Sequence, residues 1–320
     1  MSIQEPNRPI IPRKRPRINL SPPVVPPSLR VSDITTFLQR SARDENDAAN
    51  KVRERVLSCL CRPPTEFLEH PEFGPSWQLV STQWKVALAN LASDLPPYTS
   101  TSITMKGGRS HNYDANIMYY QDTTLIGTRK IEFKYGGTSI DALPQFLSLQ
   151  VKVGMFNETY DTFWYHIYLD RYLACDPELT DPKPSLETYL QCVTKTSYSV
   201  LPFFAKLKER EVFFQSEKNE VVNQSIADYL ERYGSSIDLS EFSKKVVSTQ
   251  SDKVYLLWSN NQFYIDRIST TEPMTFHGIR NGNVIEVQSG PTLYRLLLRW
   301  RNHKGILNPA WQISMKRETE

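Results

Sequence analysis

Two strand-like segments separated by a short polar run constrain the fold of this chain more than any other feature. Residues 112–120 and 128–135 are rich in β-branched and aromatic side chains, and the polar run 121–124 lies between them. We therefore predict an antiparallel hairpin. Asp114 and Glu132 lie equally far from the centre of its turn, so they should face each other with Cβ atoms about 5 Å apart.

Strand alternation then predicts which side chains share a face. Glu132 and Lys134 should point to one side of the hairpin, and Ile131 and Phe133 to the other. Two carboxylates as close as Asp114 and Glu132 repel each other unless a cation lies between them. Oxygen ligands of this kind suit Mg²⁺, which proteins usually hold with one or two carboxylates plus water and phosphate oxygens.

The arrangement of Asp114 followed by Glu132-X-Lys134 resembles the PD-(D/E)XK nucleases, which include many restriction endonucleases and recombination exonucleases. The proline that usually precedes the aspartate in that family is replaced here by Tyr113. The resemblance implies Mg²⁺ or Mn²⁺ held by Asp114, Glu132 and the carbonyl of Phe133. It also implies a metal-dependent DNA endonuclease that hydrolyses phosphodiester bonds by in-line attack of water, assisted by Lys134.

A helix is predicted directly after the hairpin. Over residues 139–153, Ile140, Leu143 and Leu147 recur at helical spacing. Some branches of the family place a glutamine on the corresponding helix, next to the lysine or the cleaved phosphate. By that resemblance, Gln145 is a further catalytic candidate.

The remaining segments predict an α/β fold. Residues 44–60 and 77–92 have the apolar periodicity of helices, and 99–106 alternates like a strand. The resemblance implies a restriction-endonuclease-like core, in which helices flank a mixed central sheet. We expect four segments, namely a leader over 1–30, a helical layer over 31–98, a nuclease core over 99–175 and a helical and β-containing extension over 176–320.

Two other interpretations of the hairpin do not involve catalysis. Asp114, Glu132 and Lys134 would also be compatible with a solvent-facing ribbon whose cross-strand ion pairs contribute about 0.2–1 kcal/mol each. The functional alternative is a catalytically inactive, nuclease-like DNA-binding or interaction protein. Such a protein would derive from a mobile element or virus, or would act as a nuclear effector.

The leader carries most of the positive charge of a chain whose formal net charge is only +3. Residues 1–30 contain six basic side chains against one acidic side chain, and eight prolines that disfavour a packed core. Within it, residues 12–17 have the density of a nuclear localisation signal, formed by Arg13, Lys14, Arg15 and Arg17. This pattern predicts binding to a nuclear import receptor and a location in the nucleus. An arm that contacts nucleic acid phosphates is the alternative.

A second basic region lies near the end of the chain. Residues 287–317 contain six lysine or arginine residues and no acidic residue. We predict DNA contacts from this region and from the basic connection that precedes the hairpin, through Arg299, Arg301, His303, Lys304, Lys106 and Arg109.

Other classes of protein fit the sequence less well. No apolar stretch approaches the ~20 residues that a membrane helix requires, so no membrane partner is expected. The glycine pairs at 107–108 and 136–137 lack the spacing of a phosphate-binding loop, and no Gly-X-Ser-X-Gly elbow is present. The four cysteines lack zinc-site spacing. Paired cuts in duplex DNA would predict a homodimer, although no segment identifies its interface.

Overall fold

The computed structural model describes residues 29–42, 45–106, 111–268 and 272–318. These residues form two compact units. The first unit contains the described residues up to Met105 together with Asn116–Arg129, and the second contains Lys106–Ala115 together with the described residues from Lys130 onward. Strand β3 (Thr124–Tyr135) contributes residues 124–129 to the first unit and residues 130–135 to the second.

The first unit is built around a helix with one apolar face. Its elements are α1 (Asp33–Leu38), α2 (Asn46–Cys59), α3 (Thr65–Leu68), α4 (Gly74–Leu91), β1 (Ser100–Met105), most of β2 (Ala115–Gln121) and the first half of β3. Trp77, Trp84 and Leu91 recur at helical spacing along α4 and are almost fully buried. Tyr119 of β2 is buried beside this helix and donates a hydrogen bond to the carbonyl of Leu88 at 3.2 Å.

A strand is present on each side of the turn at 121–124, β2 over Ala115–Gln121 and β3 over Thr124–Tyr135, but residues 112–114 of the first predicted strand, which include Asp114, form a bend before β2. The first sheet has the strand order β1-β2-β3-β5-β6. In the second unit, β5 (Val254–Ser259) runs parallel to the second half of β3, and β6 (Gln262–Asp266) pairs antiparallel with β5. Asn260 and Asn261 join β5 to β6 with positive φ angles of 50° and 59°, as a tight hairpin turn requires.

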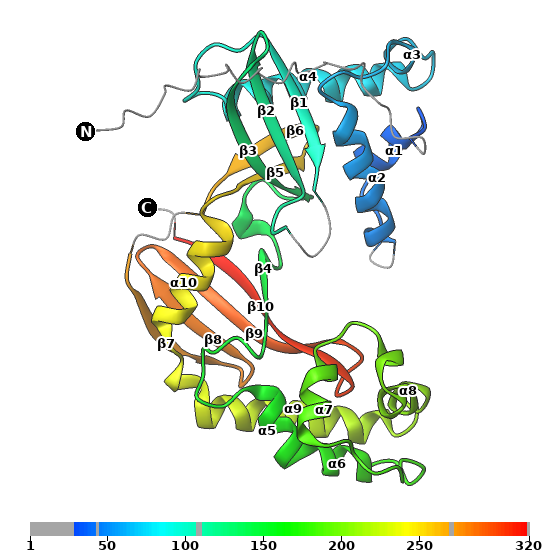
Figure 1. Ribbon diagram of the computed structural model, residues 1–320, viewed down its shortest axis with the longest axis vertical. Helices are drawn as coiled ribbons and strands as arrows, with labels where there is room; N and C mark the ends of the chain where they lie inside the picture. The colour runs from blue at the N-terminus through cyan, green and yellow to red at the C-terminus, as the bar shows by residue number, and fades with distance from the viewer. Residues whose placement is uncertain (1–28, 43–44, 107–110, 269–271, 319–320) are drawn as a thin grey trace, which may run out of the picture. The chain divides into compact units, whose positions relative to one another are not determined.

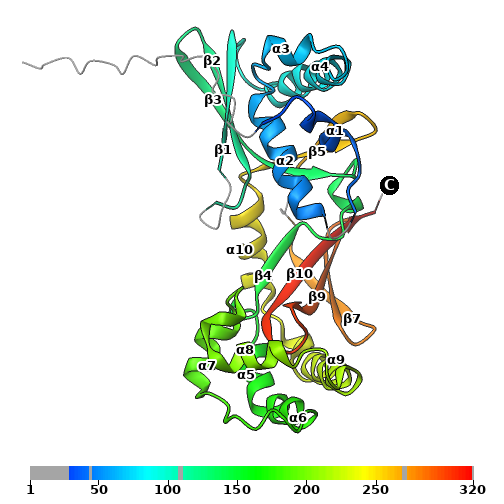
Figure 2. The ribbon, with the colours of Figure 1, turned by 90° about the vertical axis from the view of Figure 1, so that its right-hand side faces the viewer.

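The second sheet lies wholly within the second unit and has the order β4-β10-β9-β8-β7. Figures 1 and 2 show helices α5–α9 gathered at one end of this sheet. The remaining elements of the unit are η1 (Ile140–Ala142), β4 (Leu147–Gln150), α5 (Tyr160–Phe163), the π-helical turn η2 (Trp164–Tyr168), α6 (Leu169–Ala174), α7 (Leu186–Val193), η3 (Tyr198–Val200), α8 (Pro202–Glu209), α9 (Gln215–Tyr233), η4 (Gly234–Ser236), α10 (Leu239–Gln250), β7 (Met274–Arg280), β8 (Val284–Ser289), β9 (Thr292–Asn302) and β10 (Leu307–Arg317).

Alternation along β9 separates the core of this unit from solvent. Trp300 is buried, and its indole N–H donates to the hydroxyl of Tyr160 at 3.2 Å. Tyr160 in turn shares a hydrogen bond of 2.8 Å with Ser225 of α9. The adjacent Arg299 and Arg301 are exposed because successive side chains of a strand point to opposite faces.

The prediction of a helix over residues 139–153 is wrong. Within that range the chain forms the short turn η1 and then β4, which pairs antiparallel with β10 through Leu149 opposite Trp311 and Gln150 opposite Ala310. Apolar and polar residues alternate through β4 into Val151, and both Leu149 and Val151 are buried. Cross-strand pairing therefore overrides the helical spacing of the same apolar residues.

The protein is thus a mixed α/β structure, as predicted, and it contains two sheets where a single central sheet was expected. The restriction-endonuclease-like core and the segment boundaries at 31–98, 99–175 and 176–320 stay predictions. Between these boundaries, α1–α4 occupy the predicted helical layer, and strands and helices follow in both later segments.

The packing of the second sheet generates a matched test of stability. Ile285 of β8 is fully buried, whereas Ile279, its partner across the ladder on the edge strand β7, is 38% exposed. We expect Ile285→Ala to lower the free energy of unfolding by about 2–5 kcal/mol, because it leaves a cavity in the core. Ile279→Ala should cost well under half of that amount. Denaturant titration measures both, and equal losses would contradict the assigned sheet order.

Candidate active site

Backbone pairing brings Asp114 and Glu132 together. The amide N–H of Asp114 donates to the carbonyl of Ile131 at 2.8 Å, and the Oδ2 atom of Asp114 accepts from the amide N–H of Phe133 at 2.8 Å. These two contacts bracket Glu132 in the sequence. The structure therefore places the Asp114 carboxylate beside the backbone that carries Glu132, while the predicted position of the two residues directly opposite each other stays a prediction.

Glu132 lies between two lysines. Its Oε1 atom accepts from the Nζ of Lys134 at 2.6 Å, which agrees with the prediction that both side chains leave the same face of β3. Its Oε2 atom lies 3.2 Å from the Nζ of Lys253. The Glu132 side chain is only 14% exposed, so these two cations offset the cost of burying its charge.

Lys253 is the functional candidate that sequence reasoning missed. Its side chain is only 3% exposed, and its Nζ also donates to the carbonyl of Asn112 at 2.6 Å. Burial lowers the pKa of Lys253, although the nearby charge of Glu132 acts in the opposite direction. A lysine buried this deeply next to a carboxylate belongs to the same electrostatic cluster as Lys134.

The parallel pairing of β3 with β5 explains how Lys253 reaches the site. Ile131 lies opposite Val254, so the residue before β5 arrives next to Glu132. Residues 254–258 are all buried, as expected of a parallel strand that is covered on both faces. The only signal in the sequence is a single lysine placed directly before this apolar run.

The carboxylates also affect a tyrosine on β5. Burial is the main cause that raises the pKa of the Tyr255 hydroxyl, and the charges of Glu132 and Asp114 raise it further. Tyr255 therefore stays protonated, and its ring faces the ammonium of Lys253 with 5.3 Å between Nζ and the ring centroid.

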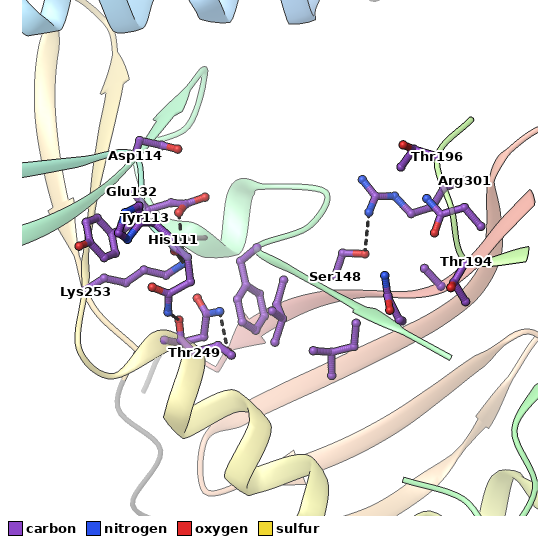
Figure 3. A pocket seen from close by; sticks show the side chains of 18 residues that line it. His111, Tyr113, Asp114, Glu132, Ser148, Thr194, Thr196, Thr249, Lys253 and Arg301 are labelled. Carbon is purple, nitrogen blue, oxygen red and sulfur yellow. Dashed lines mark hydrogen bonds and ion pairs between the residues drawn. The ribbon is translucent and has the colours of Figure 1, made fainter. Parts of the chain in front are cut away.

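A cavity of about 660 Å³ opens beside this cluster, entirely within the second unit. Figure 3 shows Asp114, Glu132 and Lys253 at one end of the cavity and Ser148 and Arg301 at the other. Arg301 donates from a guanidinium nitrogen to the Oγ of Ser148 at 3.4 Å. Of the predicted DNA contacts that lie within the described residues, Arg301 is thus the one that shares this cavity with the carboxylates.

Metal binding by the carboxylate pair stays a prediction. Among the described residues, no group of three or more histidine, cysteine, aspartate and glutamate side chains is placed to hold a metal ion. Asp114 and Glu132 supply two carboxylates at one end of the cavity, and Mg²⁺ is commonly held by one or two carboxylates with water and phosphate oxygens. For Glu132 to bind such an ion, one of its lysine contacts would have to open.

Gln145 is not on a helix. It lies between η1 and β4, so the structural basis for assigning it a catalytic role is absent. Phe133 contributes its amide N–H to the Asp114 carboxylate, and metal binding by its carbonyl stays a prediction.

The other predicted DNA contacts are dispersed. Arg299 donates to the side chain of Gln312 at 2.9 Å, and His303 lies 2.6 Å from a Glu211 carboxylate oxygen. Lys304 is exposed at the turn between β9 and β10, and the half-buried Lys106 donates its amide N–H to the carbonyl of Asp114 at 2.7 Å. The predicted contact Arg109 and the predicted localisation residues Arg13, Lys14, Arg15 and Arg17 lie outside the described residues.

Neither a scan against protein-family models nor searches of curated proteins and of solved structures found a match to this chain. In the portion of the chain that the structure describes, no helix is both long enough and apolar enough to cross a membrane.

Ion-pair burial generates a prediction with a matched lysine control. Lys253→Met should lower the free energy of unfolding by about 3–5 kcal/mol, because it leaves Glu132 partly buried with one cation fewer. Lys130→Met removes an ion pair with Asp252 whose side chains are 39% and 42% exposed, so it should cost about 1 kcal/mol or less. Thermal or denaturant unfolding measures the stability loss of each variant. Equal losses would contradict the burial of the ion pair between Lys253 and Glu132.

Proposed function

We propose that this protein is a metal-dependent DNA endonuclease with a PD-(D/E)XK-type centre. One observation carries the proposal. Asp114, in the bend before β2, accepts from the backbone between Glu132 and Lys134 of β3, and the two carboxylates line one cavity. A restriction-endonuclease-like core is part of the same proposal, supported by helices around a mixed sheet in which β3 runs parallel to β5.

In this proposal, Asp114 and Glu132 would hold Mg²⁺ or Mn²⁺, together with the carbonyl of Phe133. When bound, such an ion supplies an activated water and neutralises charge on the phosphate. The amide N–H of Phe133 fixes the orientation of the Asp114 carboxylate. Lys134 and Lys253 hold Glu132 before a substrate arrives, and one of these two contacts would open when Glu132 binds the ion.

Lys134 is the proposed proton-transfer and phosphate-orienting group. Its side chain is 31% exposed, in contrast to the buried Lys253, so it can turn from Glu132 toward a substrate. An ammonium there can orient the attacking water and stabilise charge that develops on the phosphate. We place this activity in the nucleus, to which an import receptor that binds residues 12–17 would carry the protein.

A second function is favoured by the same ion pairs. Both oxygens of Glu132 already contact lysine ammonium groups, an arrangement that would serve a charge-neutral binding scaffold as well as an enzyme. The corresponding candidate is a catalytically inactive nuclease-like protein that binds DNA or another nuclear partner.

Cleavage assays decide between the two functions. Purified protein is incubated with supercoiled plasmid, single-stranded DNA and RNA in Mg²⁺, Mn²⁺ or EDTA. We expect DNA cleavage that requires the metal and disappears in Glu132→Ala, and a loss of about 10²–10⁴-fold in Lys134→Ala. Glu209→Ala, which changes a glutamate with a 70% exposed side chain, should leave the rate unchanged.

The opposite results are equally informative. DNA binding without cleavage by the unmodified protein would favour the inactive scaffold. Cleavage that persists in Glu132→Ala would exclude this site as its source.

A further inference from the structure

A second cavity, of about 540 Å³, lies wholly within the first unit. Its lining comes from one face of α4, the residues that follow α2 and the start of β1. Among the described residues that line it are two cations, Arg62 and Lys85, and no aspartate or glutamate. Neither cation forms an ion pair with another residue that the structure describes. The cavity therefore carries an excess of positive charge, which favours an anionic ligand.

Helix α4 places a hydroxyl beside one of these cations. Ser81 and Lys85 are four residues apart on α4, and both line the cavity. Residues at this spacing are neighbours on one face of a helix, with Cβ atoms about 5–6 Å apart. Ser81 is buried, whereas Lys85 is exposed, so the ammonium can reach a ligand that enters from solvent.

The contacts of Cys61 bring the second cation to the same cavity. Burial raises the pKa of the Cys61 thiol, although its hydrogen bonds with Thr101 of β1 and Trp84 of α4 act in the opposite direction. The thiol therefore stays protonated and adds no negative charge to the cavity. Arg62 directly follows Cys61, and Lys85 directly follows Trp84. The contact between Cys61 and Trp84 thus joins the two backbone segments that carry the cations.

Two serine hydroxyls at the cavity wall have unused hydrogen-bonding capacity. The Oγ atoms of Ser81 and Ser100 are buried and have no hydrogen-bond partner among the described residues. Buried hydroxyls usually have a partner, which can be a protein group, an ordered water or a ligand. Rotation about one bond directs each hydroxyl, so a ligand can engage it without a change in the backbone.

The same cavity offers an accessible apolar surface. Pro63, Leu68 and Tyr98 line it, and each is only half-buried. Its volume of about 540 Å³ is within the range of small-molecule sites, about 300–1,000 Å³, and can hold far more atoms than an inorganic anion has. A ligand that uses the whole cavity therefore combines an anionic group with an apolar body.

We propose that this cavity binds a small phosphomonoester with an apolar body, whose phosphate contacts Arg62 and Lys85. A phosphomonoester carries a charge of about −1.5 to −2 near pH 7, which two cations match. The planar guanidinium fork and the compact ammonium group both suit phosphate oxygens. This phosphomonoester site needs neither Asp114 nor Glu132, so it is independent of the proposed nuclease function.

Calorimetric titration with phenyl phosphate tests the phosphomonoester site. The full-length protein is titrated in EDTA with phenyl phosphate, inorganic phosphate and phenol. EDTA removes any metal through which Asp114 and Glu132 could bind a phosphate. We expect phenyl phosphate to bind at least about tenfold more tightly than either of its two parts, because only the whole molecule uses both the cations and the apolar lining.

Two substitutions and two matched controls locate the binding. Arg62→Gln and Lys85→Met should each weaken the binding of phenyl phosphate about tenfold, because each removes a charge-assisted hydrogen bond. Arg40→Gln and Lys51→Met change exposed residues of the first unit that do not line this cavity, so they should leave the affinity unchanged. All four changed side chains are exposed, and melting temperatures verify that each variant has folded.

The outcomes decide the proposal whether or not the protein cleaves DNA. Weakened binding in both cavity variants and in neither control would support the phosphomonoester site. Equal and weak binding of phenyl phosphate and inorganic phosphate would indicate an adventitious ion only and overturn the proposal. An affinity for phenyl phosphate that Arg62→Gln and Lys85→Met leave unchanged would overturn it as well.

Discussion

The candidate site depends on how the negative charge of one partly buried carboxylate is compensated by neighbouring ammonium groups. Glu132 contacts Lys134 on its own strand and Lys253 from the neighbouring strand, while Asp114 is held by the backbone beside it. The two carboxylates and two ammonium groups make the cluster close to neutral, which reduces the cost of removing each charge from water. The same balance keeps negatively charged oxygens fixed at the wall of a cavity, where a cation and a phosphate could meet.

The local parts of this arrangement could be predicted from sequence. Alternating side chains are sufficient to put Glu132 and Lys134 on one face, and the polar turn is sufficient to bring the segment of Asp114 beside them. The prediction of a helix over 139–153 was wrong because the apolar residues of this segment fit both the period of a helix and the period of a strand. Leu147 and Leu149 belong to a clear alternation, and only the distant strand β10 determines that this period, and not the helical one, is realised.

The long-range parts could not be predicted in this way. Lys253 and Glu132 are 121 residues apart, and their contact depends on the parallel pairing of β3 with β5, which no local pattern specifies. Arg301 was predicted as a DNA contact from charge alone. Its place in the same cavity as Glu132 depends on β4, the strand mistaken for a helix, because Ser148 of that strand accepts its hydrogen bond.

The central claim is that Asp114 and Glu132 form one divalent-metal site. Iron-mediated backbone cleavage tests it directly, since Fe²⁺ bound in place of Mg²⁺ reduces added hydrogen peroxide to hydroxide and a hydroxyl radical that cuts the chain next to its ligands, with ascorbate returning Fe³⁺ to Fe²⁺. The account predicts fragments from breaks near residues 114 and 132, suppressed by excess Mg²⁺ and absent in Asp114→Ala. Breaks elsewhere, or none that Mg²⁺ suppresses, would contradict it.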